Sequence, residues 1–271
     1  MVSLHIKNKN IVLIFLIFFA IYYNSYSQTG PEQGSVNSKN KAFKKGEVLE
    51  YRVHYGFVDA GTAKIEIKEE DKKIAGRNVL HAIGTGKSHW TFDWFFKVRD
   101  KYETYMDEEG LFPWLFVRRV DEGGYHIKQD YAFFQNKDTV DNGAGKRFAI
   151  PHGTQDMLSS FYFARNMELN DAKAGDIFSL EAFIDDSVWT GKLKFLGTDT
   201  VEIDLGKFSC LKFAPIVQKG RIFKKEEDLT LFITNDKNKI PILAEAKILV
   251  GSVKMELQSY SGLAYPISKV N

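Results

Sequence analysis

His152, Asp156, Ser159 and Ser160 come nearest, among the residues of this sequence, to a catalytic group. A serine hydrolase needs a serine within hydrogen-bond reach of a histidine that a carboxylate orients. The same residues also suit the start of a helix, because Thr154 can serve as the N-cap and Asp156 complements the helix dipole. We favour this structural interpretation and keep hydrolysis as the weaker alternative.

The segment TQDMLSSFYFARN (Thr154–Asn166) must position these residues, and it predicts the one clear helix of the chain. It is apolar nearly all round, and Arg165 lies near its C-terminal end, where a cation suits the helix dipole. We expect this helix to fill the interior of a sheet. The open question is whether Phe161 and Tyr162 meet only the sheet or also a ligand.

Asp100 is an acidic residue in an apolar pattern. In KVRDKYETYM it shares a strand face with Val98, Tyr102 and Met106, so alternation points it inward. A buried carboxylate needs a partner, and the return strand brings Arg118 and Arg119 opposite it. We predict a partly buried ion pair between Asp100 and these arginines, which would either fix the strand register or line a pocket.

Aromatic residues gather in the segment HWTFDWFFK. They either belong to the core or form a rim that meets an apolar ligand or a membrane surface. With the helix, they give the predicted lining of a hydrophobic site: Trp90, Trp94, Phe95, Phe96, Tyr102, Met157, Phe161 and Tyr162.

Catalytic and metal-binding motifs are otherwise missing from the sequence: it contains no G-x-S-x-G, H-E-x-x-H, phosphate-binding glycine loop or C-x-x-C. We expect His54 and His126 to face solvent and Cys210, in KFSCLKF, to be a buried structural thiol. Asp185-Asp186 and Asn235-Asp236 are predicted to be turn residues, and a calcium site at either pair is the weaker interpretation. We therefore predict no catalytic residues, no metal and no cofactor, and leave open whether the chain is an enzyme.

Short strand patterns follow one another without strand–helix–strand alternation, which favours an antiparallel sheet. EVLEYRVHYGF places Leu49, Tyr51, Val53, Tyr55 and Phe57 on one face, and VDAG reads as the next turn. With one apolar helix, these strands predict a mainly β fold: a curved antiparallel sheet that forms an incomplete or closed barrel around the helix.

The last hairpin, PILAEAKILVGSVKMELQSY, predicts a type II′ turn at Gly251-Ser252. That turn would pair Val250 with Val253, Ile248 with Met255, Ala246 with Leu257 and Ala244 with Ser259, all on one face. The other face would pair Lys247 with Glu256 and Glu245 with Gln258. A bulge at Gly251 within one long strand is the competing interpretation.

The N-terminus resembles a secretory signal. His5, Lys7 and Lys9 precede the apolar run Ile11–Tyr23, and cleavage is expected after Ser27. An uncleaved membrane anchor is the alternative. A lipid anchor is not expected, because no cysteine lies near the predicted cleavage site. Removing Lys7 and Lys9 reduces the 37 basic residues to 35, equal to the 35 acidic ones, which argues against a nucleic-acid partner.

We divide the 271 residues into a signal peptide (1–27), a flexible leader (28–45), a single β-rich domain (46–262) and a C-terminal tail (263–271). The 44% hydrophobic and 14% aromatic content supports a sizeable core in that domain.

Several segments in this order resemble one family of exported bacterial proteins, named as domain of unknown function 3108. They are GEVLEYRVHYGFVDAGTA, DWFFKVRDKYETYMD, QDMLSSFYFAR, GKFSCLKFAPIVQKGRIF and ITNDKNKIPILAEAKILVGSVKMELQSY. The resemblance covers nearly all of Gly46–Tyr260 and implies export in Gram-negative bacteria of the Bacteroidetes type. It implies no activity, substrate or catalytic residue.

Together these observations predict an exported cell-envelope protein, periplasmic or secreted, that binds a lipid or another hydrophobic ligand. We also expect peripheral contact with the outer membrane, and the oligomeric state stays open. The main alternative is a non-catalytic interaction or assembly module, whose surface would show apolar patches or a free sheet edge. An integral outer-membrane barrel fits less well, because strands such as VKMELQSY carry charges on one face and modest apolar residues on the other.

Overall fold

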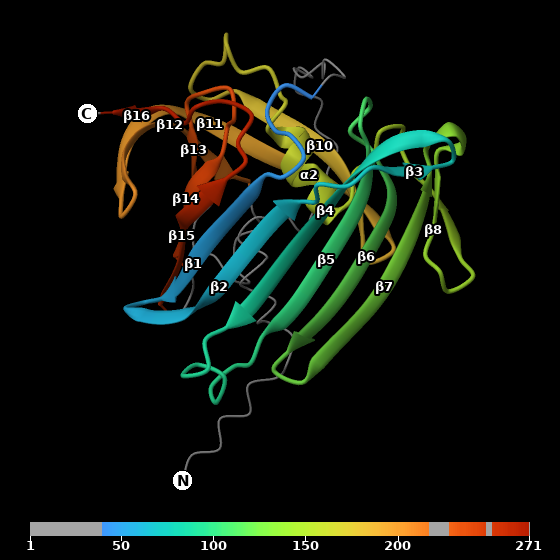
Figure 1. Ribbon diagram of the computed structural model, residues 1–271, viewed down its shortest axis with the longest axis horizontal. Coiled ribbons are helices and arrows are strands. Elements are labelled where there is room, and N and C mark those ends of the chain that lie inside the picture. The colour runs from blue at the N-terminus through green and yellow to red at the C-terminus, as the bar shows by residue number, and fades with distance from the viewer. Residues whose placement is uncertain (1–39, 217–227, 248–250, 271) are drawn as a thin grey trace.

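The computed structural model describes residues 40–216, 228–247 and 251–270, which form a strongly bent sheet around a short helix (Figure 1). The strands are β1 Val48–Tyr55, β2 Val58–Ile67, β3 Lys72–Ile74, β4 Arg77–Ser88, β5 Arg99–Asp107, β6 Pro113–Glu122, β7 Tyr125–Phe134, β8 Thr139–Asp141, β9 Arg147–Ala149, β10 Ile177–Ile184, β11 Ser187–Ile203, β12 Gly206–Pro215, β13 Leu229–Thr234, β14 Pro241–Lys247, β15 Ser252–Ser261 and β16 Lys269–Val270. The helix α2 spans Met157–Ala164, and a 3-10 turn spans Gln135–Lys137.

All the strands belong to one antiparallel sheet, as the sequence predicted. Its order is β10-β11-β12-β13-β14-β15-β1-β2-β4-β5-β6-β7-β8-β9, with β3 added beside β4 and β16 beside β12. Strand β15 pairs with β1, so the last long strand joins the first one in the middle of the sheet. Most of the described ladders therefore join strands that are consecutive in the sequence, and the exceptions are β1–β15, β2–β4 and β12–β16.

The sheet curls into an incomplete barrel whose two edges, β9 and β10, approach each other. Within the described residues no strand ladder joins these edges, and side chains cover the gap instead. The Phe183 ring of β10 lies 5.3 Å from the ring of Phe148 and 5.2 Å from that of Tyr131. The main chain of Gln155 also pairs with β10, donating to Glu181 O and accepting from Phe183 N, both at 2.8 Å.

Alternation explains the inner face of β1, where Leu49, Tyr51 and Val53 are buried. The predicted turn at VDAG is wrong, because residues 58–61 already belong to β2 and the chain reverses at Gly56-Phe57. Gly56 has a positive φ of 58°, which suits a tight reversal, and Phe57 projects fully into solvent instead of joining the inner face.

The last hairpin keeps its predicted faces but not its predicted register. Ala246 pairs with Val253 and Ala244 with Met255, so the pairing of Ala246 with Leu257 is wrong. Lys247 pairs with Ser252, and the predicted pairs of Ile248 and Val250 lie outside the described residues. The shift is by an even number of residues, so the same side chains stay buried.

Helix α2 lies inside the sheet, in contact with β4 and β5 on one side and β10 on the other (Figure 1). It begins two residues later than predicted, with Asp156 instead of Thr154 as its N-cap. Met157, Leu158, Phe161 and Tyr162 are buried, so the helix fills the core as expected. No helix in the described part of the chain is long and apolar enough to cross a membrane.

The compact domain extends beyond both predicted boundaries. Ala42 and Phe43 are buried, and Lys41 N donates to Asn166 Oδ1 at 2.7 Å, so the flexible leader does not reach residue 45. At the other end, Asn238 exchanges hydrogen bonds with the main chain of Tyr265, and β16 pairs with β12. Residues 263–270 are therefore part of the domain; residues 1–39, with the predicted signal, lie outside the description.

Candidate functional site: an apolar pocket beside helix α2

The two helix serines serve the helix cap. Asp156 Oδ1 accepts hydrogen bonds from Leu158 N and Ser159 N, both at 2.7 Å, and Ser159 Oγ accepts one from Asp156 N at 2.8 Å. Ser160 Oγ donates to Asp156 O at 2.6 Å. His152 lies exposed outside the core, with Nδ1 3.0 Å from Asp138 Oδ1. The serine–histidine arrangement that a hydrolase needs is therefore not formed by these residues.

Asp156 is fully buried, and this changes its acidity. Burial raises the pKa of its carboxyl to about 7, although hydrogen bonds from Thr104, Ser159 and Leu158 favour the charged form. The carboxyl thus joins the helix start to β5 through Thr104.

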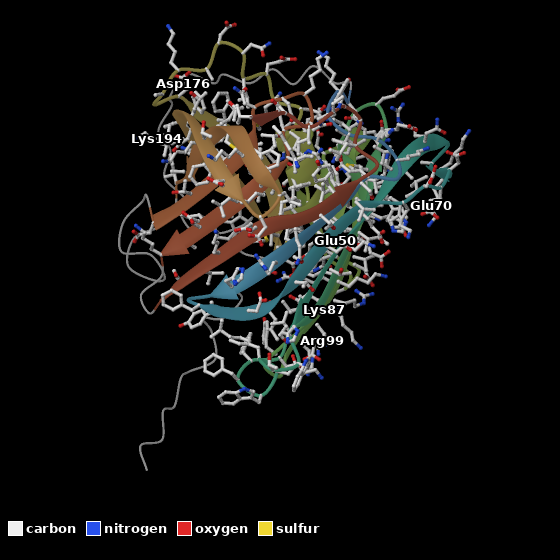
Figure 2. All side chains as sticks on the ribbon, turned by 60° about the vertical axis from the view of Figure 1, so that its left-hand side comes forward. Glu50, Glu70, Lys87, Arg99, Asp176 and Lys194 are labelled. Carbon is white, nitrogen blue, oxygen red and sulfur yellow. The ribbon has the colours of Figure 1, made fainter. Side chains whose placement is uncertain are left out.

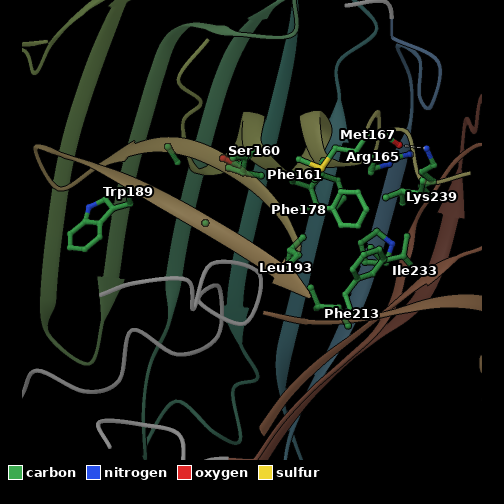
Figure 3. A pocket seen from close by; sticks show the side chains of 17 residues that line it. Ser160, Phe161, Arg165, Met167, Phe178, Trp189, Leu193, Phe213, Ile233 and Lys239 are labelled. Atoms are coloured by element: carbon green, nitrogen blue, oxygen red, sulfur yellow. Dashed lines mark hydrogen bonds between the residues drawn. The ribbon is translucent and has the colours of Figure 1, made fainter. Parts of the chain in front are cut away.

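A pocket lies between the C-terminal half of α2 and the concave face of β10–β14. Its empty volume is about 940 Å³, which includes the space open to solvent at its mouth. Figure 3 shows Trp189 at one end of the pocket and Arg165 and Lys239 at the other, with Phe178, Leu193 and Phe213 between them. The wall is lined by Ser160, Phe161, Ala164, Arg165, Met167, Leu169, Phe178, Leu180, Ala182, Trp189, Gly191, Leu193, Phe213, Leu231, Ile233, Lys239 and Pro241.

Strand register builds this apolar wall. Across the β10–β11 hairpin, Phe178 faces Leu193, Leu180 faces Gly191 and Ala182 faces Trp189. Because side chains on one face of a strand recur every second residue, all of these point to the same side. Strands β12 and β13 continue the wall with Phe213 opposite Leu231.

Two basic side chains stand at one end of the pocket, and their surroundings differ. Arg165 is fully buried, and its guanidinium forms two hydrogen bonds, of 2.6 and 2.8 Å, with the carboxylate of Glu47. Burial opposes its charge, but the attraction of Glu47 outweighs this and raises the pKa of Arg165. The half-buried Lys239 donates from Nζ to Met167 O at 2.6 Å. Burial lowers the pKa of Lys239, although Glu168 acts in the opposite direction.

The predicted lining residues scatter over three environments. Phe161 lines the pocket, while Tyr102, Met157 and Tyr162 are buried in the core. Trp90, Trp94 and Phe95 are exposed on the loop between β4 and β5, and Phe96 packs beside Gly123, where a Cβ would lie 2.4 Å from its ring. Strand alternation in FSLEAFI and LTLFIT places Phe178, Leu180, Leu231 and Ile233 on common faces, but it carries no signal for the empty space beside them.

The predicted ion pair of Asp100 is wrong. Arg119 instead pairs with Asp130 at 2.7 Å on the outer surface, and Arg118 pairs with Asp185 at 3.0 Å. Asp100 is buried and accepts a hydrogen bond from Asp121 N at 3.1 Å, and its carboxyl lies close enough to Glu122 to affect the pKa of both groups. The register explains the difference, because Arg118 lies opposite Tyr102 and Arg119 opposite Lys101.

The Asp100 and Glu122 carboxyls are both buried inside the barrel and influence each other's acidity. Burial, followed by the hydrogen bond and charge of Asp100, raises the pKa of Glu122, and burial raises that of Asp100 as well. The positive charge of Arg118 acts against both shifts. The pair connects β5 to β6. Neither carboxyl is accessible to solvent, so the pair is not placed to act on a substrate.

The remaining candidates are structural. Cys210 is buried, as predicted, and burial raises the pKa of its thiol to about 12. His126 is exposed as predicted, while His54 is half-buried beside Asp59. Asp185 and Asp186 have positive φ values of 48° and 60° and form the predicted hairpin turn. Across the described ranges, no group of three or more His, Cys, Asp or Glu side chains could hold a metal ion.

Comparison with known proteins identifies a family and a fold. The model of the family described as protein of unknown function (DUF3108) matches residues 50–258. No curated protein matches the chain. Among solved structures, the β-barrel-like protein of domain of unknown function DUF1849 from Brucella abortus is similar with a TM-score of 0.50 and 12% identity. That match covers 83% of this chain and 100% of the other.

Two further structures align more loosely. One comes from Parabacteroides distasonis, with a TM-score of 0.36, and one, with a YmcC-like fold, from Bacteroides fragilis, with a TM-score of 0.32. Each is 10% identical, and each alignment covers 83% of this chain and 99% of the other. The Brucella structure supports the barrel-like fold found here.

Proposed function

Since the chain belongs to the family of proteins of unknown function DUF3108, its activity has to be inferred from its geometry, and we propose that it is an exported protein of the cell envelope that binds a lipid or another hydrophobic ligand. The pocket beside α2 carries this proposal. Its wall is apolar apart from Ser160, Arg165 and Lys239, which is the kind of lining that apolar ligands meet in binding sites.

The position of the pocket supports binding rather than catalysis. The lining side chains Leu180, Trp189, Leu193 and Ile233 are only half-buried, so apolar surface remains in contact with water at the pocket. Covering that surface with an apolar chain is favourable by about 25 cal/mol per Å². Export is supported by the sequence pattern of residues 1–27, a basic start followed by an apolar run and small residues.

Filling the pocket with protein tests the proposal. Ala164 lies on α2 and lines the pocket, so Ala164→Trp should occupy part of the space. We expect the purified chain to release lipid on organic extraction and, once stripped, to bind a fluorescent fatty-acid analogue, and we expect Ala164→Trp to weaken that binding at least about tenfold. Ala144→Trp, which adds the same ring at an exposed loop, is the matched control and should bind as the original chain does. Equal binding by both variants, with the fold intact by circular dichroism, would refute the pocket.

A second function, docking on a lipid bilayer, is favoured by an exposed cluster that we call the aromatic rim: Phe57, Trp90, Trp94 and Phe95. Phe57 is fully exposed, and the other three side chains are 77%, 85% and 61% exposed. His89 N donates to Ala60 O at 2.8 Å, and the Tyr55 and Phe92 rings lie 6.4 Å apart, so the loop of the last three rings packs against the β1–β2 hairpin.

The chemistry of the aromatic rim fits a bilayer surface. Trp and Phe side chains partition into the membrane interface, and basic side chains beside them favour anionic lipid. Lys87 and Lys97 are exposed next to the rim, and Figure 2 shows Lys87 and Arg99 at this end of the sheet. We propose that the rim rests on an anionic lipid surface.

Co-sedimentation with vesicles containing phosphatidylglycerol tests this contact. We expect Trp90→Ser with Trp94→Ser to reduce the bound fraction strongly and Ile177→Ser, an exposed apolar change on β10, to leave it unchanged. Unchanged binding by the double variant would contradict bilayer docking. So would a concentration-dependent dimer of the original chain that the double variant abolishes, since the rim would then join two copies.

A further inference from the structure

Lys239 is held in place by the turn between β13 and β14. The turn is closed by Asp236, whose Oδ1 accepts hydrogen bonds from Asn238 N at 2.8 Å and Lys239 N at 3.1 Å. Ile240 N donates to Thr234 Oγ1 at 2.8 Å on the other side. With its backbone fixed in this way, Lys239 lines one end of the pocket, and its ammonium group donates to Met167 O there (Figure 3).

The ammonium group of Lys239 lacks a counter-charge in the described part of the chain. No described carboxylate lies within 4.0 Å of its Nζ. Glu168 is the acidic residue whose charge acts on it, and that carboxylate pairs with Lys41 at 3.3 Å. Arg165, by contrast, is neutralised by Glu47. The pocket therefore ends in one paired cation and one that is half-buried without an acidic partner.

A half-buried cation is costly unless an anion compensates it, and a ligand can supply that anion. The rest of the pocket is apolar over the whole distance from Phe213 to Trp189. We propose that the ligand is an elongated amphiphile with one anionic head, a carboxylate or a phosphate, which pairs with Lys239 while its hydrocarbon chain runs along Phe178 and Leu193 toward Trp189.

This inference rests on the proposed function, since it assigns the head-group end of the same pocket. It is tested with the full purified chain, stripped of lipid, and with three probes of equal chain length: hexadecanoate, hexadecyl phosphate and uncharged hexadecanol. We expect both anions to bind about tenfold more tightly than hexadecanol, the gain that one charge-assisted hydrogen bond provides. Preference for one anion over the other identifies the head group.

Variants of one turn separate the head-group contact from general effects. Lys239→Met keeps the length of the side chain and should cost about tenfold in affinity for the anions without weakening hexadecanol. Lys239→Arg should retain most of the anion binding. Lys237→Met, in the same turn with its Nζ 5.3 Å from the Tyr265 ring centre, is the matched control. If Lys239→Met does not fold, Lys239→Gln replaces it.

The outcomes distinguish the two proposals. Equal affinity for anions and alcohol, or unchanged anion binding by Lys239→Met, overturns the head-group inference while the pocket proposal stands. If none of the three probes binds to the pocket, both proposals fail.

Discussion

Arg165 and Glu47 form a fully buried, two-pronged ion pair, with hydrogen bonds of 2.6 and 2.8 Å, although 118 positions separate them. The guanidinium also donates to Asn238 O at 2.9 Å and to Ala42 O at 3.3 Å. One side chain thus ties the end of α2 to the N-terminal segment, the start of β1 and the turn that carries Lys239. The charged side chain at the end of α2 therefore connects the helix to three other segments of the chain.

Glu47→Ala is expected to destabilise the chain by about 3–5 kcal/mol, because it leaves the Arg165 charge buried without its partner. Urea unfolding followed by tryptophan fluorescence measures this loss. Lys41→Ala, which breaks the exposed pair with Glu168 at 3.3 Å, is the control and should change stability by less than about 1 kcal/mol. A similar small effect for both variants would show that the buried pair does not hold the segments together.

Asp156→Asn is expected to flatten the dependence of stability on pH. Burial raises the pKa of Asp156 to about 7 in the folded chain, while the ordinary value is 3.8. The folded chain keeps a proton that the unfolded chain releases, so the contribution of Asp156 is fully present below about pH 4 and is lost as the pH rises to about 7. Thermal unfolding at pH 5 and pH 8 should show a smaller drop for Asp156→Asn than for the original chain.

Asp171→Asn, at an exposed position, is the control for that measurement and should keep the original slope. Asp156→Ala should cost about 1–3 kcal/mol at either pH, because two main-chain N–H groups lose their acceptor. An Asp156→Asn slope identical to that of the control would mean that the carboxyl stays charged in the folded chain.

Glu122→Gln is expected to stabilise the chain at alkaline pH. Burial and the neighbouring Asp100 raise the pKa of Glu122, so the folded state favours its neutral form and loses stability as the pH rises through that raised pKa. Glutamine keeps the shape of the side chain without its charge. The melting temperature at pH 9 should therefore rise relative to the original chain, with a smaller rise at pH 5.5.

Glu245→Gln, on the exposed face of β14, is the matched control and should shift the melting temperature equally at both pH values. A loss of stability at pH 9 in Glu122→Gln would show that the ionised carboxylate is the form that the interior prefers.

Gly262→Ala tests the close contact between the main chain just after β15 and Gly46. Gly262 has a positive φ of 66°, and a Cβ there would lie 2.0 Å from Gly46 O. Gly145 has a similar φ of 85° but open space around it. We expect Gly145→Ala to cost about 1 kcal/mol for its backbone conformation and Gly262→Ala to cost about 1–3 kcal/mol more, because the main chain at Gly46 must shift. Equal unfolding midpoints for the two variants would contradict the close contact.

Periodicity predicted most of the sheet, because each strand records its own buried face. The strand β1 buries Leu49, Tyr51 and Val53, the inner face that its alternation predicted. The error in the last hairpin has a physical cause: a shift by an even number of residues leaves Ala244, Ala246, Val253 and Met255 buried, so the hydrophobic pattern cannot distinguish the two registers.

The site was less predictable than the sheet. Alternation gives the face of Phe178 or Leu193, but a pocket depends on the distance between that face and α2, which no local pattern encodes. Asp100 shows the same limit. Its burial followed from alternation, while its partner depended on register, and Glu122 took the place that was expected for an arginine.

Among the described residues no strand ladder joins β9 to β10, and this affects how the width of the barrel is fixed. In a closed barrel, strand number and stagger fix the radius, whereas an open one can change its circumference without breaking a ladder. Here the width is set by the Asp185–Arg118 contact, the Asp186–Tyr131 contact at 3.1 Å and the aromatic packing of Phe183. The β10–β11 hairpin that walls the pocket is thus attached to β6, β7 and β9 by side chains and to Gln155 by two main-chain hydrogen bonds, and these few contacts fix how far it lies from the opposite wall.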